Sequence, residues 1–350
     1  MRAITVLPLT KDSAKVEEIE EPDEADGDVL VETIAVGICG TDVEIVSGDY
    51  GWSPPGEERL VLGHESVGRV ISAPTNSGFS ADDLVVGIVR RPDPEPCYAC
   101  AIGEWDACRN GRYTEHGIKE LHGFMRERYR ADAGALMKID PTLGHRGVLM
   151  EPTTIVAKAW EQALSAGHRA VWEPSSAIVL GAGPIGLLAT MIARQLGFEV
   201  TVIDHTDAGS KPELVEALGA TYHSGSVEDL KRSADVVMEC TGVPALIAQA
   251  INKTANGGVT CLTGVSQVGT DLTLDLGAIG RAMVLGNVAV IGSVNANRRH
   301  YEAASRALAK ADPAWLDGLI TRRVPLEDFS AALDRSPEDV KVVIDLSGGA

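Results

Sequence analysis

Residues that can bind a metal or move a proton occur at three separate places in the first half of the chain. The hexapeptide GICGTD contains Cys39 and Thr41, the motif GHExxG contains His64 and Glu65, and Glu151 begins the stretch EPTTIVAK. A catalytic zinc takes about three protein ligands and keeps one position open for water or substrate. Cys39, His64 and Glu151 would supply such a set, with Glu65 as an outer or exchangeable ligand.

Each of these residues also has an ordinary structural interpretation. Cys39 can be a small core residue, His64 a hydrogen-bonded turn histidine, and Glu151 a charge at a helix N-terminus. Spacing along the chain does not show that the three meet. The residues alone therefore leave both interpretations open.

A second cluster consists of three cysteines within twelve residues: Cys97, Cys100 and Cys108. Thiolates at such spacing can share one tetrahedral, structural zinc. A closed site needs a fourth ligand, for which Asp93 is the nearest candidate. The further candidates are the acidic residues Glu95, Glu104 and Asp106. Three reduced thiols without metal are the alternative.

The stretch Gly181-Ala-Gly183-Pro184-Ile185-Gly186 follows a short apolar run and precedes an apolar helical pattern. In this order the first glycine makes the tight turn and the second lets a pyrophosphate approach the backbone. The third lets the helix pack on its strand, and the helix N-terminus stabilises the anion. The sequence therefore predicts a dinucleotide site.

Asp204 ends the next predicted strand, 18 residues after Gly186. A carboxylate at this place hydrogen-bonds the adenosine ribose of NAD and repels the 2′-phosphate of NADP. We therefore expect NAD to be favoured. His205, Thr206 and Lys211 lie nearby and leave binding of NADP open.

The pattern of elements predicts an α/β protein with two domains. Short apolar runs broken by Gly and Pro fill the first 150 residues and indicate a mostly β region. Residues 151–166 have a helical pattern, after which strands alternate with helices as in a parallel, doubly wound sheet. We expect a β-rich domain over 1–165, to which 296–350 returns, and a Rossmann domain over 166–295.

Composition excludes several classes of function. The chain has 350 residues and a net charge of −19, which disfavours nucleic acid as a partner. No apolar run approaches the length of a membrane helix, and the first residues do not resemble a signal peptide. We expect a cytoplasmic protein with reduced cysteines and no membrane partner.

Together, GICGTD, GHExxG, the CxxC…C lobe and the late GxGPxG resemble the zinc-dependent medium-chain alcohol dehydrogenases. The likeness spans essentially the whole chain. It implies a GroES-like catalytic domain joined to a Rossmann domain, and a homodimer or homotetramer formed through Rossmann strands.

Within that family the chain resembles the glucose dehydrogenases of archaea and some bacteria. The stretches RYTEHGI, LHGF and GSVN carry this likeness. It implies that Glu115 contacts sugar hydroxyls and that Asn295 lines the site near nicotinamide and sugar. The expected substrate-binding residues are Thr41, Glu115, Glu151 and Asn295. The expected cofactor-binding residues are Gly181, Gly183, Pro184, Ile185, Gly186, Asp204, His205, Thr241 and Asn295.

The chain departs from the family pattern at three places. Pro94 stands where members with a full structural zinc site carry a cysteine. Ile155 stands where several sugar enzymes carry an acidic residue. His205 and Thr206 replace a basic pair that binds the NADP phosphate, in line with NAD.

The resemblance implies oxidation of an aldose at C1 to the lactone. Zinc would polarise the hydroxyl and Thr41 would accept or relay its proton, although Thr41 can equally be a turn residue bonding its own backbone. A zinc-dependent polyol or secondary-alcohol dehydrogenase is the alternative enzyme. A dinucleotide-binding regulatory or structural protein without catalysis is the alternative from another class.

Overall fold

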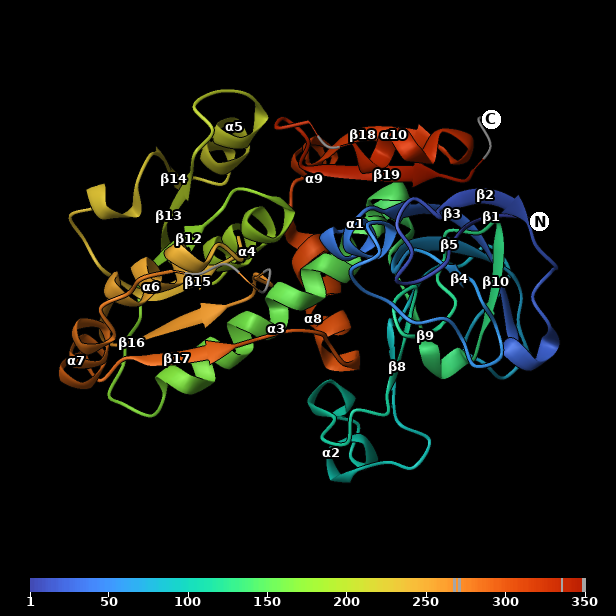
Figure 1. Cartoon of the computed structure of the whole chain (residues 1–350), viewed down its shortest axis with the longest axis horizontal. Coiled ribbons are helices and arrows are strands. Elements are labelled where there is room, and N and C mark those ends of the chain that lie inside the picture. Colours follow the sequence, from blue (N-terminus) through green and yellow to red (C-terminus); the bar gives the residue numbers. More distant parts are fainter. Residues whose placement is uncertain (267–268, 270–271, 335, 348–350) are drawn as a thin grey trace. The chain divides into compact units, whose positions relative to one another are not determined.

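The computed structural model describes residues 1–266, 269, 272–334 and 336–347 (Figure 1). The chain divides into two compact units. The first unit combines residues 1–151 with 296–350, and the second comprises 152–295. Along the chain, the boundary between the two units falls after residue 151, within helix α3 (Met150–Gly167). The domain boundary expected from the sequence lies at residue 165.

The first unit is built on a seven-stranded, mostly antiparallel sheet in the order β11-β6-β5-β3-β19-β18, with β10 also paired to β3. Its strands are β3 (Val29–Gly37), β5 (Glu65–Ser72), β6 (Leu84–Gly87), β10 (Arg128–Ala131), β11 (Leu136–Lys138), β18 (Ile320–Pro325) and β19 (Lys341–Asp345). Val29, Val31 and Val36 of β3 and Val70 of β5 belong to one apolar core. Because β19 pairs with β3, residues from the end of the chain enter this core.

Two small sheets and several helices complete the first unit. The sheets have the orders β2-β1-β4 and β7-β8-β9. Their strands are β1 (Arg2–Val6), β2 (Lys15–Glu18), β4 (Leu60–Val61), β7 (Arg90–Arg91), β8 (Thr114–His116) and β9 (Glu120–Leu121). The helices are α1 (Gly40–Val46), α2 (Tyr98–Ala101), α8 (Arg298–Lys310), α9 (Pro313–Leu319) and α10 (Phe329–Leu333).

The second unit contains a six-stranded parallel sheet in the order β14-β13-β12-β15-β16-β17. Its strands are β12 (Ser176–Leu180), β13 (Glu199–Asp204), β14 (Thr221–Ser224), β15 (Ala234–Glu239), β16 (Thr254–Leu262) and β17 (Ala289–Gly292). The helices between them are α4 (Pro184–Gln195), α5 (Ser210–Ala217), α6 (Pro244–Asn252) and α7 (Leu276–Gly286). The two central strands are almost fully buried, as in sheets covered on both faces.

Short 3-10 helices lie in both units: η1 (Glu24–Asp26), η2 (Trp105–Ala107), η3 (Ala133–Ala135), η4 (Pro141–Leu149), η5 (Val227–Asp229) and η6 (Leu326–Asp328). The predicted fold class, a β-rich unit plus a parallel α/β sheet, is confirmed. The last three residues of GICGTD begin helix α1, with Cys39 as the N-cap.

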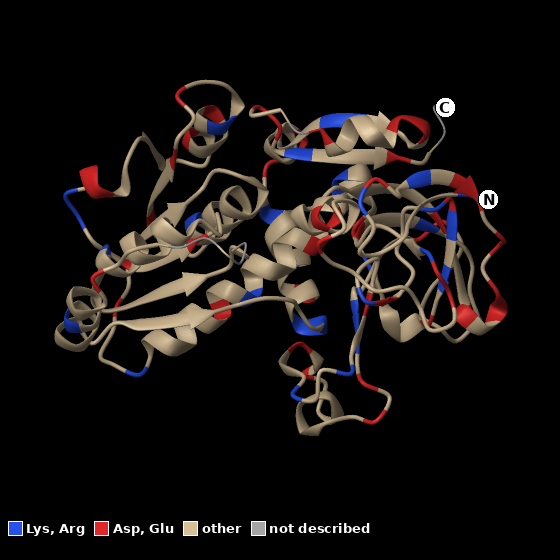
Figure 2. Ribbon diagram, in the orientation of Figure 1, with Lys and Arg blue, Asp and Glu red and all other residues tan. Residues whose placement is uncertain are grey.

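In the ribbon of Figure 2, acidic residues occur along both units. Together with the net charge of −19, they favour repulsion from polyanions. Within the described residues, none of the helices combines the length and the apolarity that crossing a bilayer requires.

Candidate functional site

The pairing of β3 with β5 brings the first predicted cluster together. Cys39 follows the end of β3, while His64 precedes β5 and Glu65 begins it. Gly37 is the register partner of Glu65. One possible ligand atom from each of Cys39, His64 and Glu65 lies within 4.8 Å of the others.

A lysine that sequence reasoning missed neutralises Glu65. Lys341, the first residue of β19, places its Nζ 2.7 and 2.6 Å from the two Glu65 carboxylate oxygens. Its Nζ also donates to the Ile38 carbonyl at 3.2 Å. Both side chains are 2% exposed. Glu65 is thus held as a paired carboxylate beside Cys39 and His64.

Asp42 is a second residue that sequence reasoning left without a role. Its Oδ2 accepts a hydrogen bond from the Cys39 backbone N–H at 2.8 Å. Its Oδ1 lies 3.6 Å from His64 Nδ1, and both side chains are buried. Metal-binding histidines commonly direct their second nitrogen at a carboxylate in this way. The position of Asp42 three residues after Cys39, on the first turn of α1, is the signal that could have found it.

The electrostatics of this cluster suit a cation. Burial raises the pKa of Asp42. Burial opposes the imidazolium of His64, yet Asp42 raises the pKa of His64 well above its usual value. Burial, together with Glu65, raises the pKa of Glu151 to about 7 although His64 acts the other way. Carboxylates crowd one another here, so a further positive charge would be stabilised.

The residues present fit a zinc ion. Thiol, imidazole and carboxylate groups are the ligands that zinc takes in catalytic sites. Asp42 Oδ1 and His64 Nδ1 are buried without a hydrogen-bond partner among the described residues. Glu151 acts electrostatically on His64 but is outside the group of three within 4.8 Å.

Thr41 and Glu115, two predicted substrate residues of the first unit, lie in segments that adjoin this cluster. Thr41 is half-buried in the first turn of α1. Glu115 lies in β8, buried, with its Oε1 3.0 Å from Arg90 Nε. Two residues later, a Cβ on Gly117 would lie 2.5 Å from the Gly63 carbonyl oxygen. Only glycine permits this contact, which places the Glu115 segment against the residue before His64.

The second predicted cluster is also brought together. Ligand atoms of Cys97, Cys100 and Cys108 lie within 4.8 Å of one another. The backbone N–H of Arg109 donates to Cys97 Sγ and lowers the pKa of Cys97 to about 6. Burial raises the pKa of Cys100 to about 11. A thiolate at Cys97 beside two further cysteine sulfurs fits the chemistry of a zinc site.

Asp93, the expected fourth ligand, is outside that group of thiols. Its carboxylate accepts from Asn110 Nδ2 and lies 3.3 Å from Arg112 Nε. The alternative acids are engaged too: Glu95 pairs with Arg112, while Glu104 and Asp106 both accept from Asn297. This last contact joins the cysteine lobe to the start of α8 within the first unit.

In the second unit, the glycine turn has the geometry that its spacing predicts. Gly181 has φ +97°, which favours glycine. A Cβ on Gly186 would lie 1.8 Å from the Gly181 carbonyl oxygen, whereas a Cβ on Gly183 would meet open space. Pro184 and Ile185 form the first turn of α4. The N-terminus of α4 is therefore presented beside the turn.

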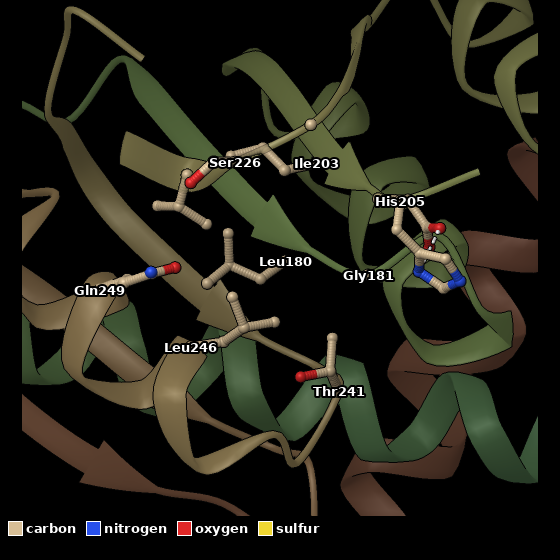
Figure 3. A pocket seen from close by; sticks show the side chains of 11 residues that line it. Leu180, Gly181, Ile203, His205, Ser226, Thr241, Leu246 and Gln249 are labelled. Carbon is tan, nitrogen blue, oxygen red and sulfur yellow. Dashed lines mark ion pairs between the residues drawn. The ribbon is translucent and has the colours of Figure 1, made fainter. Parts of the chain in front are cut away.

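A pocket opens at the carboxyl ends of β12, β13 and β15 (Figure 3). Leu180, Ile203 and Leu246 form apolar walls, and Gln249 and Thr241 add polar groups. Asp204, His205 and Ser226 complete the rim. The buried carboxylate of Glu239, which sequence reasoning missed, accepts from the Thr241 and Gly242 backbone N–H groups and fixes this turn.

Asp204 is tied to the glycine turn. Its Oδ2 accepts from the Ala182 N–H at 2.7 Å, and its Oδ1 accepts from Thr206 N and Oγ1 at 3.1 and 3.0 Å. These hydrogen bonds lower the pKa of Asp204 despite its burial. His205 is exposed beside it. Asn295 follows Val294, whose carbonyl accepts from Lys158 Nζ at 2.9 Å.

Comparisons with known proteins agree with this arrangement. The model of the alcohol dehydrogenase GroES-like domain matches residues 25–141, and that of the glucose dehydrogenase C-terminus matches 144–346. The fold and both sites thus define a medium-chain alcohol dehydrogenase.

Individual relatives indicate a branch within this family. Glucose 1-dehydrogenase of Thermoproteus tenax is 40% identical, with 98% of this chain and 99% of that protein covered. That of Methanocella arvoryzae is 36% identical, covering 99% of each. The structure of Haloferax mediterranei glucose dehydrogenase in complex with NADP, Zn and gluconolactone matches with a TM-score of 0.91, 34% identity and full coverage of both chains. The chain belongs to the glucose 1-dehydrogenase branch of the zinc-dependent medium-chain alcohol dehydrogenases, which confirms the resemblance.

Proposed function

We propose that the protein oxidises an aldose at C1: aldose and NAD⁺ give the lactone, NADH and a proton. The observation that carries this proposal is the grouping of Cys39, His64 and Glu65 in a chain that also forms the glycine turn of a dinucleotide site. Its relatives are glucose 1-dehydrogenases, and one of their structures contains gluconolactone.

The proposed metal ligands are Cys39, His64 and Glu151, with Glu65 as an outer or exchangeable ligand. When bound, zinc supplies a Lewis acid that lowers the pKa of a substrate hydroxyl. Asp42 orients the His64 imidazole, and Lys341 keeps Glu65 charge-paired. Thr41 accepts or relays the hydroxyl proton. Glu115 binds sugar hydroxyls, and Asn295 lines the nicotinamide side.

NAD is the proposed cofactor in preference to NADP. Asp204 is ionised at the rim of the pocket, and Asp207 accepts a hydrogen bond from Ser224 close by in the chain. Two carboxylates would repel a 2′-phosphate. Among the expected NAD-binding residues, four line this pocket: Gly181, Asp204, His205 and Thr241. Gly183, Pro184, Ile185 and Gly186 form the N-cap and first turn of α4, and Asn295 is the proposed residue on the nicotinamide side.

A second, structural zinc in the cysteine lobe is also proposed. Cys97, Cys100 and Cys108 would be three of its ligands. Asp93 would be the fourth, and its carboxylate would then give up the hydrogen bond from Asn110. Zinc analysis of the wild type against Cys97→Ser tests this: a fall from two ions per chain to one supports it, and one ion in both contradicts it.

We further propose a cytoplasmic homodimer or homotetramer. The helix α7 is apolar but largely exposed, including Leu276, Val284 and Leu285, and β17 is the edge strand beside it. An exposed apolar helix next to a free sheet edge is typical of a subunit interface.

A substrate panel with metal analysis tests the activity. We expect turnover of glucose, galactose or xylose with NAD⁺, at least one zinc per chain, and a loss of activity in Cys39→Ala. Turnover of sorbitol or 2-propanol alone would favour the polyol or secondary-alcohol alternative. A zinc-free native protein, or a Cys39→Ala variant with undiminished turnover, would defeat the catalytic-zinc proposal. A protein that oxidises none of these substrates would favour the non-catalytic alternative.

A further inference from the structure

Two large aromatic rings remain exposed after α1. Tyr50 and Trp52 are 38% and 42% exposed, and their ring centroids are 5.0 Å apart in an edge-to-face arrangement of 75°. Aromatic residues make up only 4% of this chain, so two adjacent exposed aromatic rings are unusual in it. Edge-to-face packing leaves the face of at least one ring available to a ligand.

The backbone holds these rings in place. Trp52 N–H donates to the Ile118 carbonyl at 3.0 Å, and Glu120 N–H donates to the Trp52 carbonyl at 3.0 Å. Trp52 thereby forms a parallel bridge with Lys119. Between the rings, Gly51 has φ +100°, and a Cβ there would lie 3.2 Å from Ile45 of α1. The aromatic pair is therefore a preorganised surface.

Polar and cationic groups border the pair. The ring of the half-buried Tyr113 lies 3.6 Å from the Arg90 guanidinium carbon and 4.4 Å from Lys119 Nζ. Arg90 in turn pairs with Glu115 at 3.0 Å. The charges of Glu115 and Arg90 both act on the Tyr50 hydroxyl. We call Tyr50, Trp52 and Tyr113 the aromatic platform.

Two chain segments connect the aromatic platform to the metal cluster. Tyr50 follows α1, which has Cys39 as its N-cap and is about 10 Å long. The segment that bridges Trp52 also carries Gly117, which packs on Gly63 beside His64. Both connections lie within the first unit. Glu115, the proposed sugar contact, lies between the platform and Gly117 in the chain.

We propose that the aromatic platform stacks against a pyranose ring of the substrate, which makes Trp52 a specificity-determining residue; this rests on the proposed function. A pyranose presents axial C–H groups on one face and hydroxyls at its edge. The C–H groups match the electron-rich face of an aromatic ring, and the hydroxyls match Arg90, Glu115 and Lys119. Neither a small apolar alcohol nor the nicotinamide would use this surface.

The first experiment compares steady-state kinetics of the zinc-loaded wild type with Trp52→Ala, Trp52→Phe and the control Tyr98→Ala, whose ring is also exposed but lies on α2. We expect Trp52→Ala to raise the KM for the best aldose at least about tenfold, with kcat and the KM for NAD⁺ little changed. Trp52→Phe should restore most of the affinity, and Tyr98→Ala should match the wild type. An unchanged aldose KM in Trp52→Ala would overturn the proposal.

The second experiment measures saccharide binding without turnover, by saturation-transfer NMR on glucose and maltose in the absence of NAD⁺. Sugar signals that weaken in Trp52→Ala support the platform even if the wild type oxidises no aldose, an outcome that would sink only the proposed function. Signals that are equal in both proteins would overturn the platform. The alternative is that a second copy of the chain covers these rings, and sedimentation of both proteins tests it. A lower oligomeric state in Trp52→Ala would identify the rings as a subunit contact and overturn the proposal.

Discussion

At the scale of single residues, the metal cluster depends on a charge from a distant part of the sequence. Glu65 is buried beside Cys39 and His64. Among the residues that the structure describes, its ion-pair partner is Lys341, 276 residues later. A buried carboxylate without its partner is strongly unfavourable, whereas the intact pair contributes little beyond an apolar replacement. Removing Lys341 alone should therefore destabilise the protein far more than replacing both members of the pair.

We expect Lys341→Met to lower the free energy of unfolding by about 3–5 kcal/mol, because Glu65 would remain buried and unpaired. The double variant Glu65→Gln/Lys341→Met should recover much of that loss. Lys15→Met, in an exposed pair with Glu17, should cost less than about 1 kcal/mol. Urea denaturation measures all three, and a Lys341→Met protein as stable as Lys15→Met would contradict the interpretation.

His116 predicts a pH dependence of stability. Its Nδ1–H donates to the His122 carbonyl at 2.6 Å, and its Nε2 accepts from Arg91 at 2.8 Å. Burial and the Arg91 guanidinium hold the pKa of His116 well below its usual value. As the pH falls through about 6.5, the unfolded chain takes up a proton here and the folded protein does not. Stability is therefore lost as the pH falls.

Between pH 8 and 5.5, the wild type should lose about 1.4 kcal/mol more than His116→Gln, which keeps a donor and an acceptor but does not titrate. The measurement is the free energy of unfolding of both proteins at equal zinc concentration. A stability difference between them that does not vary with pH would refute the assignment of a neutral imidazole.

At the scale of elements, the sequence predicted those helices, strands and turns that depend on interactions between residues close together in the chain. The helical pattern over 151–166 and the strands that alternate with helices after it follow from apolar periodicity and from flanking Gly and Pro. The glycine turn was predictable because its spacing carries its geometry. Helix α1 was not expected, since seven residues with glycine at the start give little periodic signal.

The candidate site was only partly accessible from sequence. The types and spacing of the three lobe cysteines indicated a shared site, whereas Cys39, His64 and Glu65 became candidates through the resemblance of their motifs to a known family. Lys341 and Glu239 were not, because each acts through a partner that only strand pairing or a turn brings near. The engagement of Asp93 by Asn110 and Arg112 likewise arises from loop packing. Long-range charge pairs leave no periodic trace in a sequence.

Two glycines of the same turn should respond differently to alanine. Gly186→Ala should lower stability by about 1–3 kcal/mol, because its Cβ would collide with the Gly181 carbonyl. Gly183→Ala should leave the melting temperature nearly unchanged, since its Cβ meets open space, yet weaken NAD⁺ binding about tenfold or more by obstructing the pyrophosphate. Thermal unfolding and NAD⁺ titration distinguish them. Equal effects of the two substitutions on stability would argue against this account.

At the scale of the whole molecule, electrostatic repulsion between negatively charged subunits opposes their association. The net charge is −19, and acidic side chains occur on both units, so subunits that associate need a local apolar surface. The exposed face of α7 has that character, with Val284 76% and Leu285 65% exposed.

We expect Leu285→Glu to shift the sedimentation coefficient toward the monomer, because a buried carboxylate at an interface lacks a partner. Val171→Glu, at a fully exposed valine outside α7, should leave the oligomer intact. If the two variants sediment alike, α7 is not the interface.

The pairing of β19 with β3 has a consequence for biosynthesis. A ribosome releases β3 and Glu65 early, but Lys341 emerges only after the whole second unit has been made. Until then, closing the core of the first unit would bury Glu65 with no countercharge. Residues 152–295 are contiguous and can fold as soon as they leave the exit tunnel, whereas residues 1–151 must wait. The order of completion during translation is therefore the reverse of the order in which the two units begin, and the nascent first unit is the part that needs protection from aggregation.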